Sequence, residues 1–81
     1  INQTDRFLLS ELKNGEKGKF IGVKDSSSAF LKFLDKRKIA LGSNIELLHI
    51  EDFDNSLHIG LDETNLTISI KSAANIYVTK I

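Results

Sequence analysis

Short stretches of alternating apolar and polar residues recur along this chain, and they constrain its fold more than any other feature. Leu57, Ile59 and Leu61 alternate with a histidine and a glycine. A period of two places one row of side chains on the buried face of a strand. This alternation, together with short β-branched and aromatic runs, predicts strands over 20–23, 44–50, 57–61, 66–70 and 76–78, with a 3₁₀ turn over 71–75. Five short strands at this spacing predict a mostly β protein, a small barrel.

One short helix is predicted between these strands, over about residues 28–38. Ser27 or Ser28 can cap its first turn by accepting a hydrogen bond from a free backbone N–H. Phe30 and Leu34 fall on one apolar face at helical spacing. We therefore expect the helix to act as a plug, with Phe30 and Leu34 buried against an open end of the barrel.

The composition excludes several classes of function. Lys plus Arg equals Asp plus Glu, at 11 each, which leaves no net charge and no basic stripe for nucleic acid or for a membrane surface. The chain has no cysteine, so it has neither a disulfide framework nor a thiolate metal site, and a cytoplasmic location is expected. No apolar run approaches the length of a membrane span. The domain is therefore expected to contact neither nucleic acid nor membrane directly.

The start of the sequence suggests a piece of a longer protein. The chain of 81 residues begins at Ile1 and contains no methionine. Residues 1–7 are polar up to Phe7 and are predicted to be the remnant of a linker. Residues 8–81 are predicted to form one domain.

Two histidines flank an acidic loop between the strands predicted over 44–50 and 57–61. A hairpin register that keeps Leu47 and Leu57 on one face, such as residue 49 opposite residue 59, sends His49 and His58 to opposite faces. Pairing His49 with His58 would mix the buried and exposed faces. We therefore expect two unrelated histidines rather than a pair of metal ligands.

Other kinds of chemical site have less support. Asp52, Asp54, Ser56 and Glu63 match positions 1, 3, 5 and 12 of an EF-hand loop, but Leu57 stands where that loop requires glycine. The sequence contains no nucleophile elbow and no phosphate-cradling glycine loop. We therefore expect an acidic hairpin loop rather than a calcium site, and no enzyme.

A set of glycines and apolar residues at fixed intervals resembles a known family. The pattern comprises Leu9, Leu12, Gly15, Gly18, Phe20, Ile21 and Val23, then the segment "AFLKFLDKRKIALGSNIEL", then "FDNSL" and "IYV". It is similar to the FeoA-like, SH3-like domain, and above all to the C-terminal domain of metal-dependent transcriptional repressors of the diphtheria-toxin-repressor family. The resemblance runs from about Leu9 to Val78.

The resemblance implies a regulatory function that depends on other domains. It implies an accessory domain of an iron- or manganese-dependent transcriptional repressor, which packs against the DNA-binding and dimerisation domains of its own chain. The full-length protein would bind DNA as a homodimer and take Fe²⁺ or Mn²⁺, whereas the isolated domain would hold no cofactor. The alternative is a free-standing FeoA-type accessory protein of ferrous iron transport.

The resemblance also points to the start of the helix as a place for metal ligands. In some of these repressors the barrel supplies a Glu and a Gln, three residues apart, to a metal site shared with the DNA-binding half. Ser26 and Ala29 occupy the corresponding positions here, and neither fits. Asp25 is the one carboxylate close by, so it is the candidate ligand, and only together with ligands from the rest of a longer chain.

Overall fold

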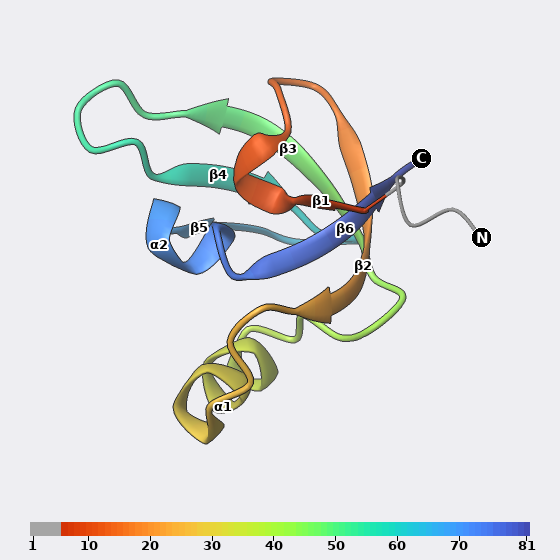
Figure 1. Ribbon diagram of the computed structural model, residues 1–81. Helices are drawn as coiled ribbons and strands as arrows, with labels where there is room; N and C mark the ends of the chain where they lie inside the picture. Colours follow the sequence, from red (N-terminus) through yellow and green to blue (C-terminus); the bar gives the residue numbers. More distant parts are fainter. Residues whose placement is uncertain (1–5) are drawn as a thin grey trace.

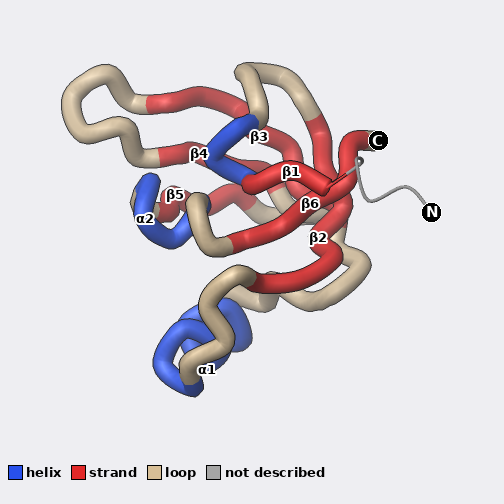
Figure 2. Tube along the Cα trace, in the orientation of Figure 1, coloured by secondary structure: helices blue, strands red, loops and turns tan. Residues whose placement is uncertain are grey.

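One antiparallel sheet organises residues 6–81, the part of the chain that the computed structural model describes (Figure 1). Its six strands lie in the order β1-β6-β2-β3-β4-β5. The strands are β1 (Arg6–Leu8), β2 (Lys17–Val23), β3 (Asn44–Ile50), β4 (Leu57–Gly60), β5 (Asn65–Ile68) and β6 (Ile76–Lys80). The helices are the 3₁₀ helix η2 (Leu9–Glu11), α1 (Ser28–Lys36) and α2 (Ile70–Ala73). The prediction of a mostly β fold with one interposed helix is confirmed (Figure 2).

The structure has one strand more than predicted, at its N-terminal end. Arg6 and Phe7, which the sequence placed in a linker, lie in β1 and pair with Thr79 and Val78 of β6. The other residues of the predicted linker, 1–5, lie outside the described residues. β1 lies at the edge of the sheet and is only partly buried, so its sequence can be mostly polar. The strand was therefore not predicted from the sequence.

The turn predicted near the C-terminal end is a short α-helix, and it begins earlier than expected. The Ser69 side chain accepts a hydrogen bond from the Ser72 backbone N–H at 3.1 Å and caps α2. This cap draws Ile70 into the helix, so β5 ends at Ile68 although the apolar alternation continues to residue 70. Ile70 is consequently exposed rather than buried.

The hydrophobic core lies on one face of the sheet and is built mainly from strand residues. Its fully buried large side chains are those of Leu9, Ile45, Leu47, Leu57, Ile59, Ile76 and Val78. The alternation in β3 and β4 thus marks core positions, as predicted. No helix within residues 6–81 is long and apolar enough to cross a membrane.

The helix α1 stands away from the sheet (Figures 1 and 2). Ser27 caps it, because its side chain accepts a hydrogen bond from the Phe30 backbone N–H at 3.3 Å. Leu34 is the buried residue of this helix, as predicted. The predicted burial of Phe30 is wrong: its ring is only partly buried and stacks on Phe33, with the ring centroids 5.9 Å apart. Phe33 packs against the core in the same partial way, so both rings contact the core and leave an edge at the surface.

Candidate functional site

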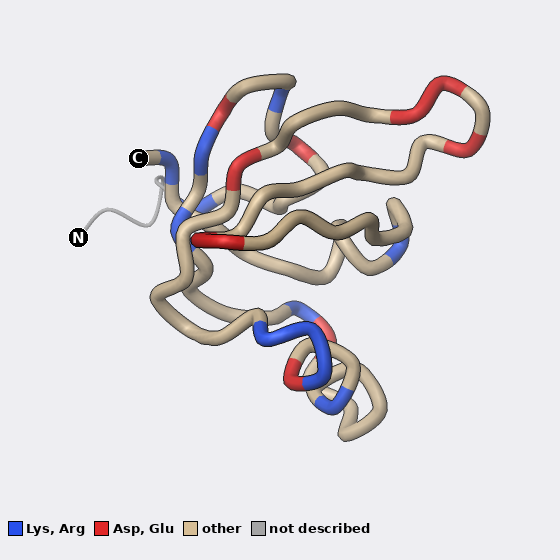
Figure 3. The backbone as a smooth tube through the Cα atoms, turned by 180° about the vertical axis from the view of Figure 1, so that it is seen from behind, with Lys and Arg blue, Asp and Glu red and all other residues tan. Residues whose placement is uncertain are grey.

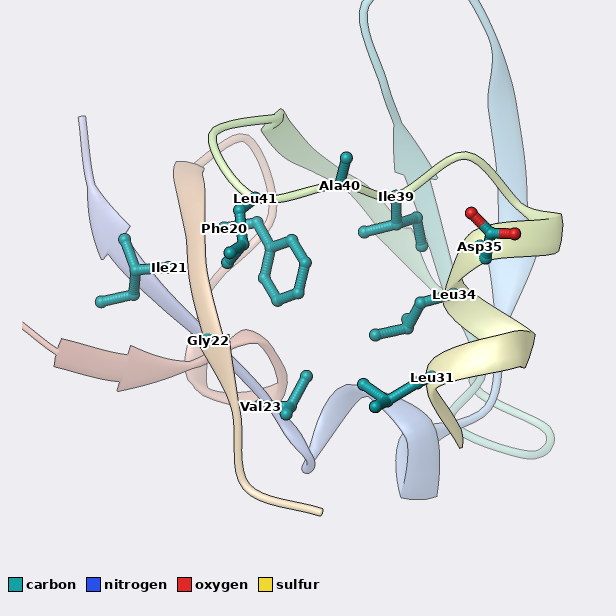
Figure 4. A pocket seen from close by; sticks show the side chains of 10 residues that line it. All are labelled: Phe20, Ile21, Gly22, Val23, Leu31, Leu34, Asp35, Ile39, Ala40 and Leu41. Atoms are coloured by element: carbon teal, nitrogen blue, oxygen red, sulfur yellow. The ribbon is translucent and has the colours of Figure 1, made fainter. Parts of the chain in front are cut away.

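An apolar groove separates α1 from β2 (Figure 4). Its volume is about 370 Å³. Val23 on one wall faces Leu31 and Leu34 on the other, whereas Ile21 points away from the space between them. The remaining lining comes from Phe20, Gly22, Asp35, Ile39, Ala40 and Leu41. The floor belongs to the core, but Leu31 and Leu41 on the rim remain 45% and 71% exposed.

The backbone after α1 shapes one end of this groove. Lys38 has a positive φ of 61°, and the Ile39 N–H donates to the Leu34 carbonyl while the Lys38 N–H donates to the Asp35 carbonyl. These are the two hydrogen bonds of a Schellman motif, which turns the chain sharply after a helix. The turn buries Ile39 beside Leu34 and carries Leu41 to the rim.

Basic residues gather at the end of α1, whereas acidic residues gather at the tip of the β3–β4 hairpin (Figure 3). Lys36, Arg37 and Lys38 are all exposed, and the Arg37 guanidinium lies 4.0 Å from the centroid of the Phe33 ring. The groove itself is lined almost entirely by apolar residues, with Asp35 as the one charged residue among them. Such a surface suits a protein segment better than a small polar substrate.

The predicted metal-ligand region lies in an exposed loop directly before α1. Asp25, Ser26 and Ala29 are all exposed. Asp25 Oδ1 accepts a hydrogen bond from the Ser27 N–H at 2.9 Å, so the carboxylate supports the start of the helix. Within residues 6–81, no three His, Cys, Asp or Glu side chains are already arranged to hold a metal ion.

The predicted separation of the two histidines is wrong, and a β-bulge is the reason. Leu47 pairs with Ile59, which is the apolar-consistent register expected from the sequence. The register then shifts by one residue at Leu48, so that His49 pairs with His58. The extra residue lets both rows of side chains keep their faces. The two imidazole rings lie side by side, with centroids 5.6 Å apart.

The acidic loop at the hairpin tip has the local geometry of a turn. Asp54 Oδ1 accepts hydrogen bonds from the Ser56 N–H at 3.0 Å and from the Ser56 hydroxyl at 2.8 Å. These bonds, the backbone one first, lower the pKa of Asp54 below its ordinary value. Glu63 lies beyond β4 in the next turn. Asp54 and Glu63, which match an EF-hand pattern in the sequence, thus lie in two separate turns.

Several solved structures share this fold. A manganese-dependent transcriptional repressor in complex with manganese matches with a TM-score of 0.88 at 18% identity, over 94% of this chain and 37% of that chain. A FeoA-like protein from Clostridium acetobutylicum matches with a TM-score of 0.86 at 20% identity, over 98% of this chain and 91% of that chain. The protein ScaR with bound Zn²⁺ matches with a TM-score of 0.83 at 24% identity, over 93% of this chain and 37% of that chain.

The fold and these likenesses define a small SH3-like domain of the kind found in metal-dependent regulators and in FeoA proteins. The sequence profile of the FeoA domain matches residues 7–80, and the chain belongs to this family. It spans less than half the length of the manganese-dependent repressors that it matches, 42% and 37%. No curated protein matches the sequence.

Sequence reasoning missed two features of this surface. The groove depends on how far α1 stands from β2, which no local pattern reports. The histidine pair depends on the bulge at Leu48. One feature of the sequence indicates this bulge: Leu48 directly follows Leu47 and so breaks the apolar alternation in β3.

Proposed function

We propose that this domain is an accessory regulatory module of an iron- or manganese-dependent transcriptional repressor, and that it acts by docking rather than by catalysis. The observation that carries the proposal is the groove between β2 and α1, whose rim exposes Leu31 and Leu41. Its occupant would be an apolar segment of the DNA-binding or dimerisation domains of the same longer chain. The likeness to repressors of which a domain of this size forms less than half supports this proposal.

In this proposal the full-length repressor is a cytoplasmic homodimer that contacts DNA through its other domains. Fe²⁺ or Mn²⁺ would bind between domains, with Asp25 as the ligand from this side. The exposed position of Asp25 beside the start of α1 leaves its second oxygen available. A site divided between two domains couples metal binding to docking, because the ion stabilises only the arrangement that brings its ligands together.

A second candidate function is that of a free-standing FeoA-type accessory protein of ferrous iron transport. The likeness to FeoA proteins whose whole chains are about this size, with 99% and 91% of their lengths covered, favours it equally. The same groove would then receive a cytosolic segment of a membrane transporter.

Binding titrations with the two kinds of partner distinguish these functions. The domain is titrated by calorimetry with the DNA-binding and dimerisation half of the repressor, with and without Mn²⁺, and separately with the cytosolic part of a ferrous iron transporter. We expect binding to the repressor half, strengthened by Mn²⁺ and lost in Leu41→Ser. Phe53→Ser is the matched control, because Phe53 is 96% exposed and lies in the loop between β3 and β4, outside the groove lining. Binding to the transporter alone would establish the second function instead.

A further inference from the structure

A cluster of two imidazoles and one carboxylate lies on the exposed face of the β3–β4 hairpin, apart from the groove. Glu51 Oε2 lies 3.6 Å from His49 Nε2 and 3.5 Å from His58 Nε2. We propose that His49, His58 and Glu51 form a binding site for a divalent transition-metal ion such as Zn²⁺ or Ni²⁺. This site does not depend on the docking function or on Asp25.

The backbone supports the site, because the pairing of His49 with His58 is built into the sheet. Directly opposed residues on antiparallel strands hold their Cβ atoms about 4.5–5.5 Å apart, within reach of one shared ion. The bulge at Leu48 creates this opposition, and without it the two rings would not be paired. Glu51 follows β3 by one residue, and its backbone N–H donates to the Ser56 carbonyl at 2.9 Å, which closes the hairpin beneath the cluster.

A hydrogen bond from the next strand orients one of the rings. His58 Nδ1 lies 3.1 Å from the Thr67 hydroxyl oxygen, and His58 pairs with Thr67 in the β4–β5 register. When Nδ1–H donates to this hydroxyl, the lone pair of Nε2 is directed toward Glu51. Metal-binding histidines commonly donate their other N–H in this way, which fixes the ring and the tautomer. Thr67 is thus a positioning residue for His58.

The two distances from Glu51 to the histidines suit a small cation. With bonds of about 2.0–2.1 Å, two ligands of a tetrahedral zinc ion lie about 3.4 Å apart. The two separations from Glu51 Oε2 lie within 0.2 Å of that value. In this structure the three side chains do not surround one point, so side-chain rotations must bring them together. Their exposed fractions of 56%, 41% and 47% leave them free to make these rotations, with water completing the coordination.

The ligand types determine which ions fit. Imidazole suits zinc, nickel and copper, whereas Mn²⁺ and Mg²⁺ prefer carboxylate, carbonyl and water oxygens. The hairpin site would therefore favour Zn²⁺ or Ni²⁺ over Mn²⁺. It would differ in selectivity from the Fe²⁺ or Mn²⁺ site proposed with Asp25.

Calorimetry of the 81-residue domain with Zn²⁺, Ni²⁺ and Mn²⁺ at neutral pH tests the site. We expect one Zn²⁺ per domain, weaker or no Mn²⁺ binding, and a melting temperature that rises with Zn²⁺ concentration. His49→Gln and His58→Gln should each weaken Zn²⁺ binding by roughly tenfold or more, and Thr67→Val by less. In spectra of the imidazole nitrogens, the zinc-bound domain should carry the proton of His58 on Nδ1.

Matched controls separate coordination from simple attraction between charges. Glu51→Gln and Asp52→Asn each remove one negative charge from the same loop, but only Glu51 approaches the histidines. Glu51→Gln should weaken zinc binding, and Asp52→Asn should leave it nearly unchanged. Equal effects of the two variants would overturn the proposal. Zinc binding that survives in the His49→Gln/His58→Gln double variant, or no zinc binding by the unaltered domain, would also overturn it.

Discussion

Lys38 occupies a backbone conformation that usually belongs to glycine. Its φ of 61° lies in the left-handed region, at the position that follows the C-cap of α1. A side chain with a Cβ costs roughly 1–2 kcal/mol there relative to a right-handed conformation. The burial of Ile39, which the turn places in the core, offsets this cost.

Replacing Lys38 with glycine should therefore stabilise the domain. We expect Lys38→Gly to raise the free energy of unfolding by up to about 1 kcal/mol, because glycine relieves the strain but increases the freedom of the unfolded chain. Lys36→Gly is the control within the last turn of α1, and it should lower stability by about 0.5–1 kcal/mol. Urea unfolding followed by circular dichroism measures both. A loss of stability in Lys38→Gly would show that the side chain itself holds the turn.

At the scale of a single element, α1 is attached to the domain through very few side chains. Leu34 is 3% exposed, whereas Phe30 packs against the core only in part. The stability that the helix contributes is therefore concentrated in one leucine, and the aromatic pair of Phe30 and Phe33 forms a secondary contact.

Truncations of the two residues should differ accordingly. Leu34→Ala should cost about 2–5 kcal/mol, the usual range for a buried leucine. Phe30→Ala should cost less, mainly its partial burial and an aromatic contact of about 0.5–1.5 kcal/mol. Thermal and urea unfolding of both variants measure the difference. A larger loss in Phe30→Ala than in Leu34→Ala would mean that the aromatic edge, rather than Leu34, holds the helix.

The stability that Asp54 adds to the β3–β4 hairpin should be lost in acid, as its carboxylate becomes protonated. Hydrogen bonds from Ser56 lower the pKa of Asp54 in the folded state. A group with a lowered folded pKa adds stability above its unfolded value, 3.8 here, and loses that stability as the pH falls through the folded pKa. Carboxyl chemical shifts followed from pH 6 to 2 should therefore give a pKa for Asp54 below 3.8. Ser56→Ala removes the hydroxyl donor and should move the pKa of Asp54 upward; an unchanged value would assign the effect to the backbone N–H alone.

The β3–β4 hairpin contains both features that sequence patterns could predict and features that they could not. The apolar rows of β3 and β4 were predictable, because burial on one face of a sheet imposes alternation. The pairing of His49 with His58 was not, because one extra residue in a strand changes the opposing partner without changing which residues are apolar. Similarly, β1 was not predicted, because an edge strand needs few apolar residues. The groove was not predicted, because its width depends on how α1 packs relative to β2.

At the scale of the whole molecule, the charges balance in number, and two local clusters of opposite sign stand out (Figure 3). Basic residues lie at the end of α1 and acidic residues lie at the tip of the β3–β4 hairpin (Figure 3). This distribution gives these two parts of the domain opposite local charge. It does not form the continuous basic surface that duplex DNA requires.

The isolated domain should therefore not bind duplex DNA appreciably at physiological salt. Fluorescence anisotropy with a labelled duplex tests this, in titrations at low and at physiological salt. We expect at most weak binding that disappears as salt rises. Submicromolar binding at physiological salt, lost when Lys36 and Arg37 are replaced by alanine, would instead make the end of α1 a nucleic-acid surface.

The pairing of β1 with β6 has a consequence for how this domain tolerates rearrangement of its chain. Arg6 lies opposite Thr79, so the two ends of the described chain leave the sheet side by side (Figure 1). A short peptide could join them, and new termini could open at Phe53, whose loop is exposed. Such a circular permutant would keep all five strand pairings of the sheet intact. For the same reason, the domain could sit within a loop of another protein, entering and leaving through one edge.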